Sequence, residues 1–248
     1  MIQSFLKGIF SYGKAAAYLT KKGLWKYTFI PGLISLLLGL GIASIAWASS
    51  DNIGQWLVSW YPFELGQSIV SNISTWIGGA IVLVIGLILY KHLVIVLVSP
   101  FMSPLSQKIE AQLLGYQSRT QSFRIDKAIK EIWRGLRMAL RNITREFLFV
   151  VPLFFLSFIP GVGIVASVLL FLVQAFYAGF GNLDYTLERH YNIDTSIQFA
   201  RQNRGMATGI GTVFLLLLAT GVGFLIAPPL AAVAGTLTTV PKLKTINT

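Results

Sequence analysis

The side chains of this sequence that could bind an ion lie at the borders of long apolar runs rather than within them. No Asp, Glu, Lys or Arg falls inside the four longest uncharged runs, which argues against a relay of buried carboxylates and bases like that of a proton pump. The candidates for an anion site or pathway are the border residues Lys26, Lys91, His92 and Glu110. In addition, the amides at the ends of broken helices can hold an anion without any buried cation.

Patterns for catalysis or metal binding are missing from the sequence. It has no cysteine, and its two histidines, His92 and His190, are far apart and match no zinc-binding spacing. Gly161 and Gly163 lack the Lys and the Ser or Thr that complete a phosphate-binding loop. We therefore expect no metal, no cofactor and no enzymatic activity.

The composition indicates a protein that lies in a membrane. Hydrophobic residues make up 54% of the 248 residues and charged residues only 12%, against roughly 25% charged residues in ordinary soluble domains. Because the charges are absent from long blocks and concentrated between them, lipid is the expected surrounding. The sequence therefore predicts an all-α integral membrane protein, with a single helical membrane domain over residues 1–248.

Two of the apolar runs are long enough for complete crossings. Residues 27–50 carry no charge before Asp51, and at about 1.5 Å per residue they cover a bilayer core of about 30 Å. A second long helix is predicted over residues 65–101, interrupted only by the polar pair Lys91 and His92 and ended by Pro100.

The other two runs, residues 147–183 and 205–241, predict helical hairpins with proline at their tips. Pro160-Gly161 breaks the first run and Pro228-Pro229 breaks the second. The first arm of the first hairpin is only about 20 Å long, whereas the bilayer core is about 30 Å thick and a crossing helix needs roughly 17 residues or more. A hairpin that enters and leaves on one side is therefore as well supported as two crossings.

The distribution of positive charge predicts the orientation of the chain. None of the 20 Lys and Arg residues falls between Tyr27 and Tyr90, whereas every later polar segment is basic or mixed. Because cytoplasmic loops carry an excess of Lys and Arg, the first loop is expected outside and both termini in the cytoplasm.

Residues 124–146 predict an amphipathic cytoplasmic helix, because apolar side chains recur at three- and four-residue steps from Ile125 to Phe147. Its basic residues are Lys127, Lys130, Arg134, Arg137, Arg141 and Arg145. This pattern suits a helix in an anionic headgroup layer, and membrane anchoring is favoured over a funnel that collects anions. The net charge of +11 does not call for a nucleic acid partner, because basic loops on one side of a membrane protein are expected.

The border residues also have purely structural interpretations. Lys26 and Lys91 could extend their charged ends to the membrane surface, and His92 could be an interfacial histidine. Glu110 could pair with Lys108 or with another base on the same side of the membrane.

Five short motifs occur in a fixed order along the chain. They are Gly23–Pro31; Ser99-Pro100-Phe101 followed by Lys108-Ile109-Glu110; Ile159–Gly163; Leu183-Asp184-Tyr185; and Ala227–Thr236. In this order and on this hydropathy profile, the chain resembles the CysZ family of bacterial sulfate permeases, which is grouped with the eukaryotic etoposide-induced membrane proteins.

The resemblance implies full spans, two partly inserted hairpins, a homo-oligomer in the bacterial inner membrane, and sulfate movement into the cytoplasm for cysteine synthesis. Family members often carry two arginines before the first span, where this chain has Trp25 and Lys26. A pair of fork-shaped donors is thus replaced by one point charge. Met102, Gln107 and Thr186 replace further family residues.

Two hypotheses of different classes follow. In the first, the protein is a sulfate-type channel or permease, with Lys26 at the anion site and Lys91, His92 and Glu110 near the route. In the second, it is a non-transporting membrane organiser that binds anionic lipids or partner proteins through the basic residues between Lys127 and Arg145.

Overall fold

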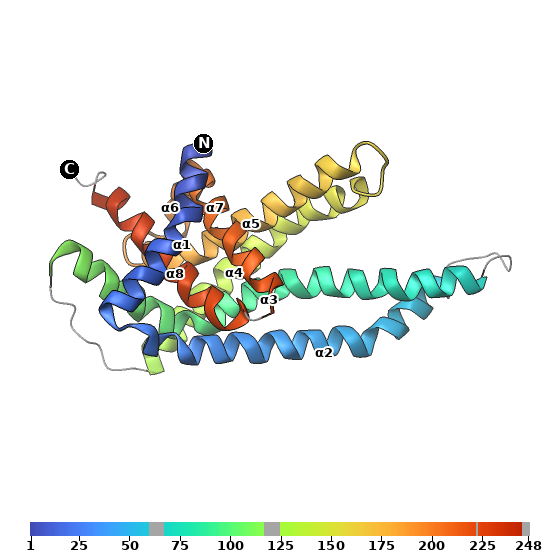
Figure 1. The fold of residues 1–248 in the computed structure, drawn as a ribbon, viewed down its shortest axis with the longest axis horizontal. Helices are drawn as coiled ribbons and strands as arrows, with labels where there is room; N and C mark the ends of the chain where they lie inside the picture. The colour runs from blue at the N-terminus through green and yellow to red at the C-terminus, as the bar shows by residue number, and fades with distance from the viewer. Residues whose placement is uncertain (60–66, 117–124, 222, 245–248) are drawn as a thin grey trace. The chain divides into compact units, whose positions relative to one another are not determined.

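The computed structural model describes residues 1–59, 67–116, 125–221 and 223–244, and every regular element in these ranges is a helix (Figure 1). The elements are α1 (Ile2–Lys22), the short 3-10 helix η1 (Trp25–Tyr27), α2 (Phe29–Ser59), α3 (Gln67–Leu114), α4 (Ile125–Leu156), α5 (Gly163–Leu187), α6 (Ile193–Gln202), α7 (Arg204–Ala219) and α8 (Gly223–Lys244). The predicted all-α fold is confirmed. Residues 65, 66 and 124 of the predicted helices lie outside the described residues.

Four helical segments among the described residues are long and apolar enough to cross a membrane. They are Trp25–Ser49, Ile88–Leu114, Gly163–Leu187 and Gly223–Leu243. Their length and composition confirm the prediction of a multi-pass membrane protein. The helix α7 is apolar as well but shorter than a span.

The chain divides into two compact units. One consists of residues 36–91, in which the middle of α2 meets the first half of α3: a Cβ added at Gly86 would lie 2.8 Å from the Ile42 side chain. The other consists of residues 1–35 and 92–248 and contains the candidate site described below.

The helix α3 continues past Pro100, where the sequence predicted its end, and carries both Pro100 and Pro104 in its interior. A proline within a helix leaves the carbonyl four residues earlier without its usual donor. For Pro100 that carbonyl belongs to Val96, and the Ser99 hydroxyl donates a hydrogen bond to it at 2.7 Å. This replacement bond explains how the helix tolerates the proline.

The helix α4 joins the predicted amphipathic helix to the first arm of the first hairpin without a break. The turn that follows contains Pro160 and Gly161, and Gly161 has a φ of 83°, in the left-handed region that favours glycine. The helix α5 then returns beside α4, as Figure 1 shows.

The second turn does not lie at Pro228-Pro229, as the sequence analysis had it; the structure places both prolines inside α8. The break between α7 and α8 follows Thr220 instead, where Gly221 has a φ of 73°. The Thr220 hydroxyl donates to the Leu217 carbonyl and accepts from the Gly223 amide, so it closes one helix and opens the next. A positive φ ends a helix more effectively than a proline, which removes only one donor.

Glycines allow α5 and α7 to pack with their backbones in contact. A Cβ added at Gly179 in α5 would lie 1.8 Å from the Ala207 carbonyl oxygen, and one at Gly211 in α7 would lie 1.7 Å from the Ala175 carbonyl oxygen. Small residues at such crossings are the usual way for membrane helices to approach closely.

We expect Gly179→Ala and Gly211→Ala each to destabilise the protein by about 1–3 kcal/mol, because the backbone opposite cannot rotate away from the new methyl group. Thermal unfolding of the purified protein in detergent measures this. Gly13→Ala in α1 is the matched control, since no atom lies within 4 Å of its added Cβ and alanine favours a helix. Equal melting temperatures for all three variants would contradict this account of the crossing.

Candidate functional site

Two lysines from different helices lie against one tyrosine ring. The chain leaves α1 at Gly23, whose φ is 62°, and the short helix η1 then presents Lys26 and Tyr27. From α3, the Lys108 ammonium donates a hydrogen bond to the Tyr27 hydroxyl at 3.3 Å and lies 4.8 Å from the ring centroid. The Lys26 ammonium lies 5.5 Å from the same centroid. We call Lys26 and Lys108 the lysine pair.

The lysine pair carries two positive charges without a carboxylate partner among the described residues. Lys26 is exposed and Lys108 is half-buried, so an anion in solution can reach them. The ring of Tyr27 holds cations through its negative face but does not neutralise them. The sequence analysis selected Lys26 as a candidate for the anion site but did not select Lys108.

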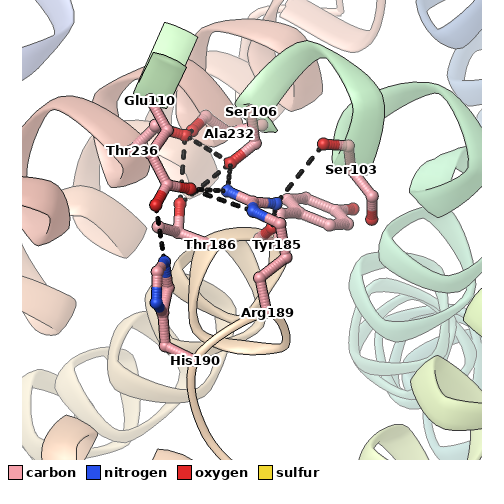
Figure 2. A network of polar contacts seen from close by, with 9 residues as sticks. All are labelled: Ser103, Ser106, Glu110, Tyr185, Thr186, Arg189, His190, Ala232 and Thr236. Carbon is pink, nitrogen blue, oxygen red and sulfur yellow. Dashed lines mark hydrogen bonds and ion pairs between the residues drawn. The ribbon is translucent and has the colours of Figure 1, made fainter. Parts of the chain in front are cut away.

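The carboxylate of Glu110 is the centre of a buried polar network (Figure 2). Its side chain is 2% exposed, and its Oε2 accepts hydrogen bonds from Arg189 Nη2 at 2.6 Å and Nε at 2.9 Å. Its Oε1 lies 2.5 Å from His190 Nε2. Glu110 therefore pairs with a base other than Lys108, one of the two structural alternatives that the sequence left open.

Arg189 uses its remaining donors to join α3 to α5. Its Nη1 donates to the carbonyls of Tyr185 and Ser103, and its Nη2 also donates to the Ser106 hydroxyl at 2.9 Å. That hydroxyl lies 2.9 Å from both Thr186 of α5 and Thr236 of α8, as Figure 2 shows. Because its donors are all occupied, Arg189 holds the helices together and offers no free group to a passing anion.

A second interior network surrounds Arg134, a residue that the sequence had assigned to the lipid interface. Its Nη2 lies 3.1 Å from Asp184 Oδ1, and its Nε lies 3.9 Å from Glu188 Oε2. Burial, and after it the neighbouring charge of Asp184, raise the pKa of Glu188 to about 8. Arg134 is thus the ion partner of Asp184 at neutral pH, while Glu188 keeps its proton.

The third interior pair joins His92 of α3 to Glu146 of α4. His92 Nε2 lies 2.9 Å from Glu146 Oε2, and both side chains are almost completely buried. Lys91 is fully buried as well. Of the four border residues that the sequence selected, the structure therefore places His92 and Glu110 in interior networks, and Lys26 at the surface.

A pocket between α3, α4 and α5 is lined by several of these polar side chains. They include His92, Ser99, Glu131, Asn142, Asp184 and Glu188. Glu131, Asp184 and Glu188 contribute three carboxyl groups to the pocket, and no Lys or Arg is among its lining residues, so it offers no cation to a divalent anion. No group of three or more His, Asp or Glu side chains in the described parts of the chain could hold a metal ion.

The remaining basic residues of α4 lie outside these networks. Lys130 and Arg137 are exposed, and the Arg137 guanidinium lies 6.0 Å from the centroid of the Trp133 ring. Arg141 and Arg145 are half-buried. Lys127 belongs to α4, but its side chain lies outside the described residues.

Comparison with known proteins identifies the family of this chain. The family model described as "Sulfate transporter CysZ/Etoposide-induced protein 2.4" matches residues 11–229. The chain belongs to this family. It is also 28% identical over 216 residues to the protein named sulfate transporter CysZ of Pseudomonas fluorescens (strain Pf0-1), across 86% of this chain and 84% of that relative.

The sequence analysis missed Arg189, His190 and Glu188 as parts of the site. All three directly follow the helix α5, a few residues after the apolar run that ends at Leu183. The criterion that selected Lys26, a charge at the border of an apolar run, would have selected them too.

Removing one partner of the Glu110–Arg189 pair should be costly, because the other is left buried without compensation. We expect Glu110→Ala to lower stability by about 3–5 kcal/mol. The double variant Glu110→Gln/Arg189→Gln should lose less stability than the single variants Glu110→Gln and Arg189→Gln lose together. Additive losses in melting temperature would argue against a direct pair.

The raised pKa of Glu188 predicts a dependence of stability on pH. An unfolded chain loses this proton near the ordinary value of 4.5, whereas the folded protein holds it up to about pH 8. The stability that this proton contributes is therefore fully present below pH 4.5 and is lost as the pH rises through about 8.

Glu188→Gln should flatten the fall in melting temperature between pH 4.5 and about pH 8, because glutamine does not ionise. Asp194→Asn is the control, since Asp194 is exposed and its removal should leave the slope as it is in the unmodified chain. An unchanged slope in Glu188→Gln would refute the assignment.

Proposed function

We propose that this protein is a membrane permease for an inorganic oxyanion, and that its substrate is sulfate taken into the cell for cysteine synthesis. Membership of the family and the name of the relative give the substrate class. The structural observation that carries the proposal is the lysine pair, two uncompensated ammonium groups that lie together on Tyr27.

The lysine pair has the charge that sulfate requires. Sulfate is a tetrahedral dianion, so two ammonium groups can match its charge and donate to different oxygens. Lysines hold it as point charges, without the rigid fork of arginine, which favours release as well as binding. This chemistry takes the place of the arginines that other family members carry there.

The helix α3 supplies the proposed route from this site. It carries Lys91, His92 and Glu110 along one continuous helix, and His92 and Glu110 are compensated by ion pairs. Side chains whose charges are neutralised by a partner do not hold a divalent anion as tightly as an isolated buried cation would.

The proposal places the protein in the bacterial inner membrane as a homo-oligomer with both termini in the cytoplasm. The charge distribution supports the orientation, because Lys and Arg are absent between Tyr27 and Tyr90 and present in the later polar segments. The bacterial inner membrane and the homo-oligomer are what the family resemblance implies.

Uptake of radioactive sulfate by liposomes that contain the purified protein tests this function. Lys26→Gln and Lys108→Gln should each raise the KM for sulfate about tenfold, because a hydrogen bond to a charged group contributes about 1.5–3 kcal/mol. Lys14→Gln in α1 removes an equally positive and exposed side chain, and it should change nothing.

No uptake above that of empty liposomes would reject transport of sulfate and would favour the non-transporting organiser. Uptake that is equal in the three variants would retain transport but reject the lysine pair as the binding site.

A further inference from the structure

The apolar face of α4 lies on the outside of the protein. Ile125, Ile129, Trp133 and Leu140 are each more than half exposed, although all four lie on the face that the helical period makes apolar. The same face continues to Phe155, on the arm that α4 contributes to the hairpin. One apolar strip therefore runs along the whole helix.

The interior face of α4 is made of other residues. Met138, Ala139, Asn142 and Glu146 are buried, and they point toward the rest of the unit. Ile132, Ile143 and Phe147 of the apolar face are half-buried, so the helix uses only part of this face for packing within the chain and leaves the rest exposed. An exposed apolar strip of this length is a feature of a surface that lipid or another protein covers.

Basic residues border this strip on one side. The Arg137 guanidinium lies 6.0 Å from the centre of the Trp133 ring, so charge and apolar surface meet there. Arg141 lies one turn and Arg145 two turns further along α4. The helix α6 lies beside α4, since Arg134 donates a hydrogen bond to the Ser196 hydroxyl at 3.4 Å, and α6 also carries Arg201, whose charge acts on Arg141. We call Arg141, Arg145 and Arg201 the arginine cluster.

The arginine cluster lacks the compensation that other arginines have. Arg134 pairs with Asp184, and Arg189 pairs with Glu110, whereas no ion pair to a carboxylate is present at any of the three cluster residues within the described parts of the chain.

The positive charges of the cluster therefore act on one another. Burial lowers the pKa of Arg141 from its ordinary value, and the charges of Arg145 and Arg201 lower it further. Tyr177 and Asp194 act in the opposite direction but leave the pKa lowered. Like charges held together in this way make a site for an anion.

We propose that the phosphate of an anionic phospholipid binds between Arg141, Arg145 and Arg201, with its acyl chains along the exposed apolar face of α4. Neither feature alone would select a lipid, because a free oxyanion needs no apolar surface and an uncharged lipid needs no arginine. Their adjacency selects a ligand with a phosphate group and hydrocarbon chains. By joining α4 to α6, the lipid would stabilise the folded protein.

The test is thermal unfolding of the full chain in a neutral detergent, with added phosphatidylglycerol or phosphatidylcholine. Phosphatidylglycerol should raise the melting temperature of the unmodified chain, and phosphatidylcholine should not. The triple variant Arg141→Gln/Arg145→Gln/Arg201→Gln should lose this stabilisation.

Without anionic lipid, the triple variant should melt at the same temperature as the unmodified chain or above it, because it removes like-charge repulsion. A merely structural role for these arginines predicts the reverse. Arg204→Gln, which removes an exposed arginine at the start of α7, should keep the full response to phosphatidylglycerol.

Two further arms separate the sources of the phosphate chemistry. Trp133→Ser shortens the apolar face, and it should weaken the response to phosphatidylglycerol several-fold. Equal stabilisation by inorganic phosphate or sulfate, unaffected by Trp133→Ser, would overturn the proposal in favour of a free-oxyanion site. A change of oligomeric state in Trp133→Ser, with no response to phosphatidylglycerol in the unmodified chain, would overturn it in favour of a second copy covering this face.

Discussion

The ion pair between Glu110 and Arg189 sets the positions of the helices in the larger unit. A carboxylate that is 2% exposed is tolerable only with a charged partner and with hydrogen bonds for its other lone pairs, and here Arg189 and His190 supply them. Arg189 can do so only if α3 and the end of α5 are held at one separation. The hydroxyl groups of Ser106, Thr186 and Thr236 then bring α8 to the same place. The packing of three helices therefore depends on the compensation of one buried charge.

Two groups of basic side chains can be distinguished among the described residues. Arg189, Arg134 and His92 lie next to acids inside the protein, and their hydrogen bonds join helices. The lysine pair and the arginine cluster are at the periphery and lack carboxylate partners among the described residues. Inside a low-dielectric protein an unpaired charge is costly, whereas at the edge it attracts a mobile anion at little cost. Whether a basic side chain has a structural or a ligand-binding role therefore depends on whether it has a carboxylate partner, not on its residue type.

Much of the fold could be predicted from the sequence, because a membrane demands long apolar helices and leaves few alternatives. The errors are local and have identifiable causes. The helix α3 continues past Pro100 because the Ser99 hydroxyl replaces the missing hydrogen bond, and the turn between α7 and α8 depends on the positive φ of Gly221. A hydropathy profile shows neither feature. The site was predicted less well. Glu110 meets Arg189 across 79 residues of chain, and Tyr27 meets Lys108 across 81, so only the packed helices bring these partners together.

The outward apolar face of α4 shows why periodicity means something different in a membrane. In water, the apolar side of an amphipathic helix is its packing side, because burial of that side drives folding. Lipid chains are as apolar as leucine, so a helix beside them gains nothing from turning that side inward. Small and polar residues can then take the interior face, as Ala139, Asn142 and Glu146 do. The basic residues are consequently left at the edge of the apolar strip, where a hydrocarbon chain and a phosphate group of one molecule can both be bound.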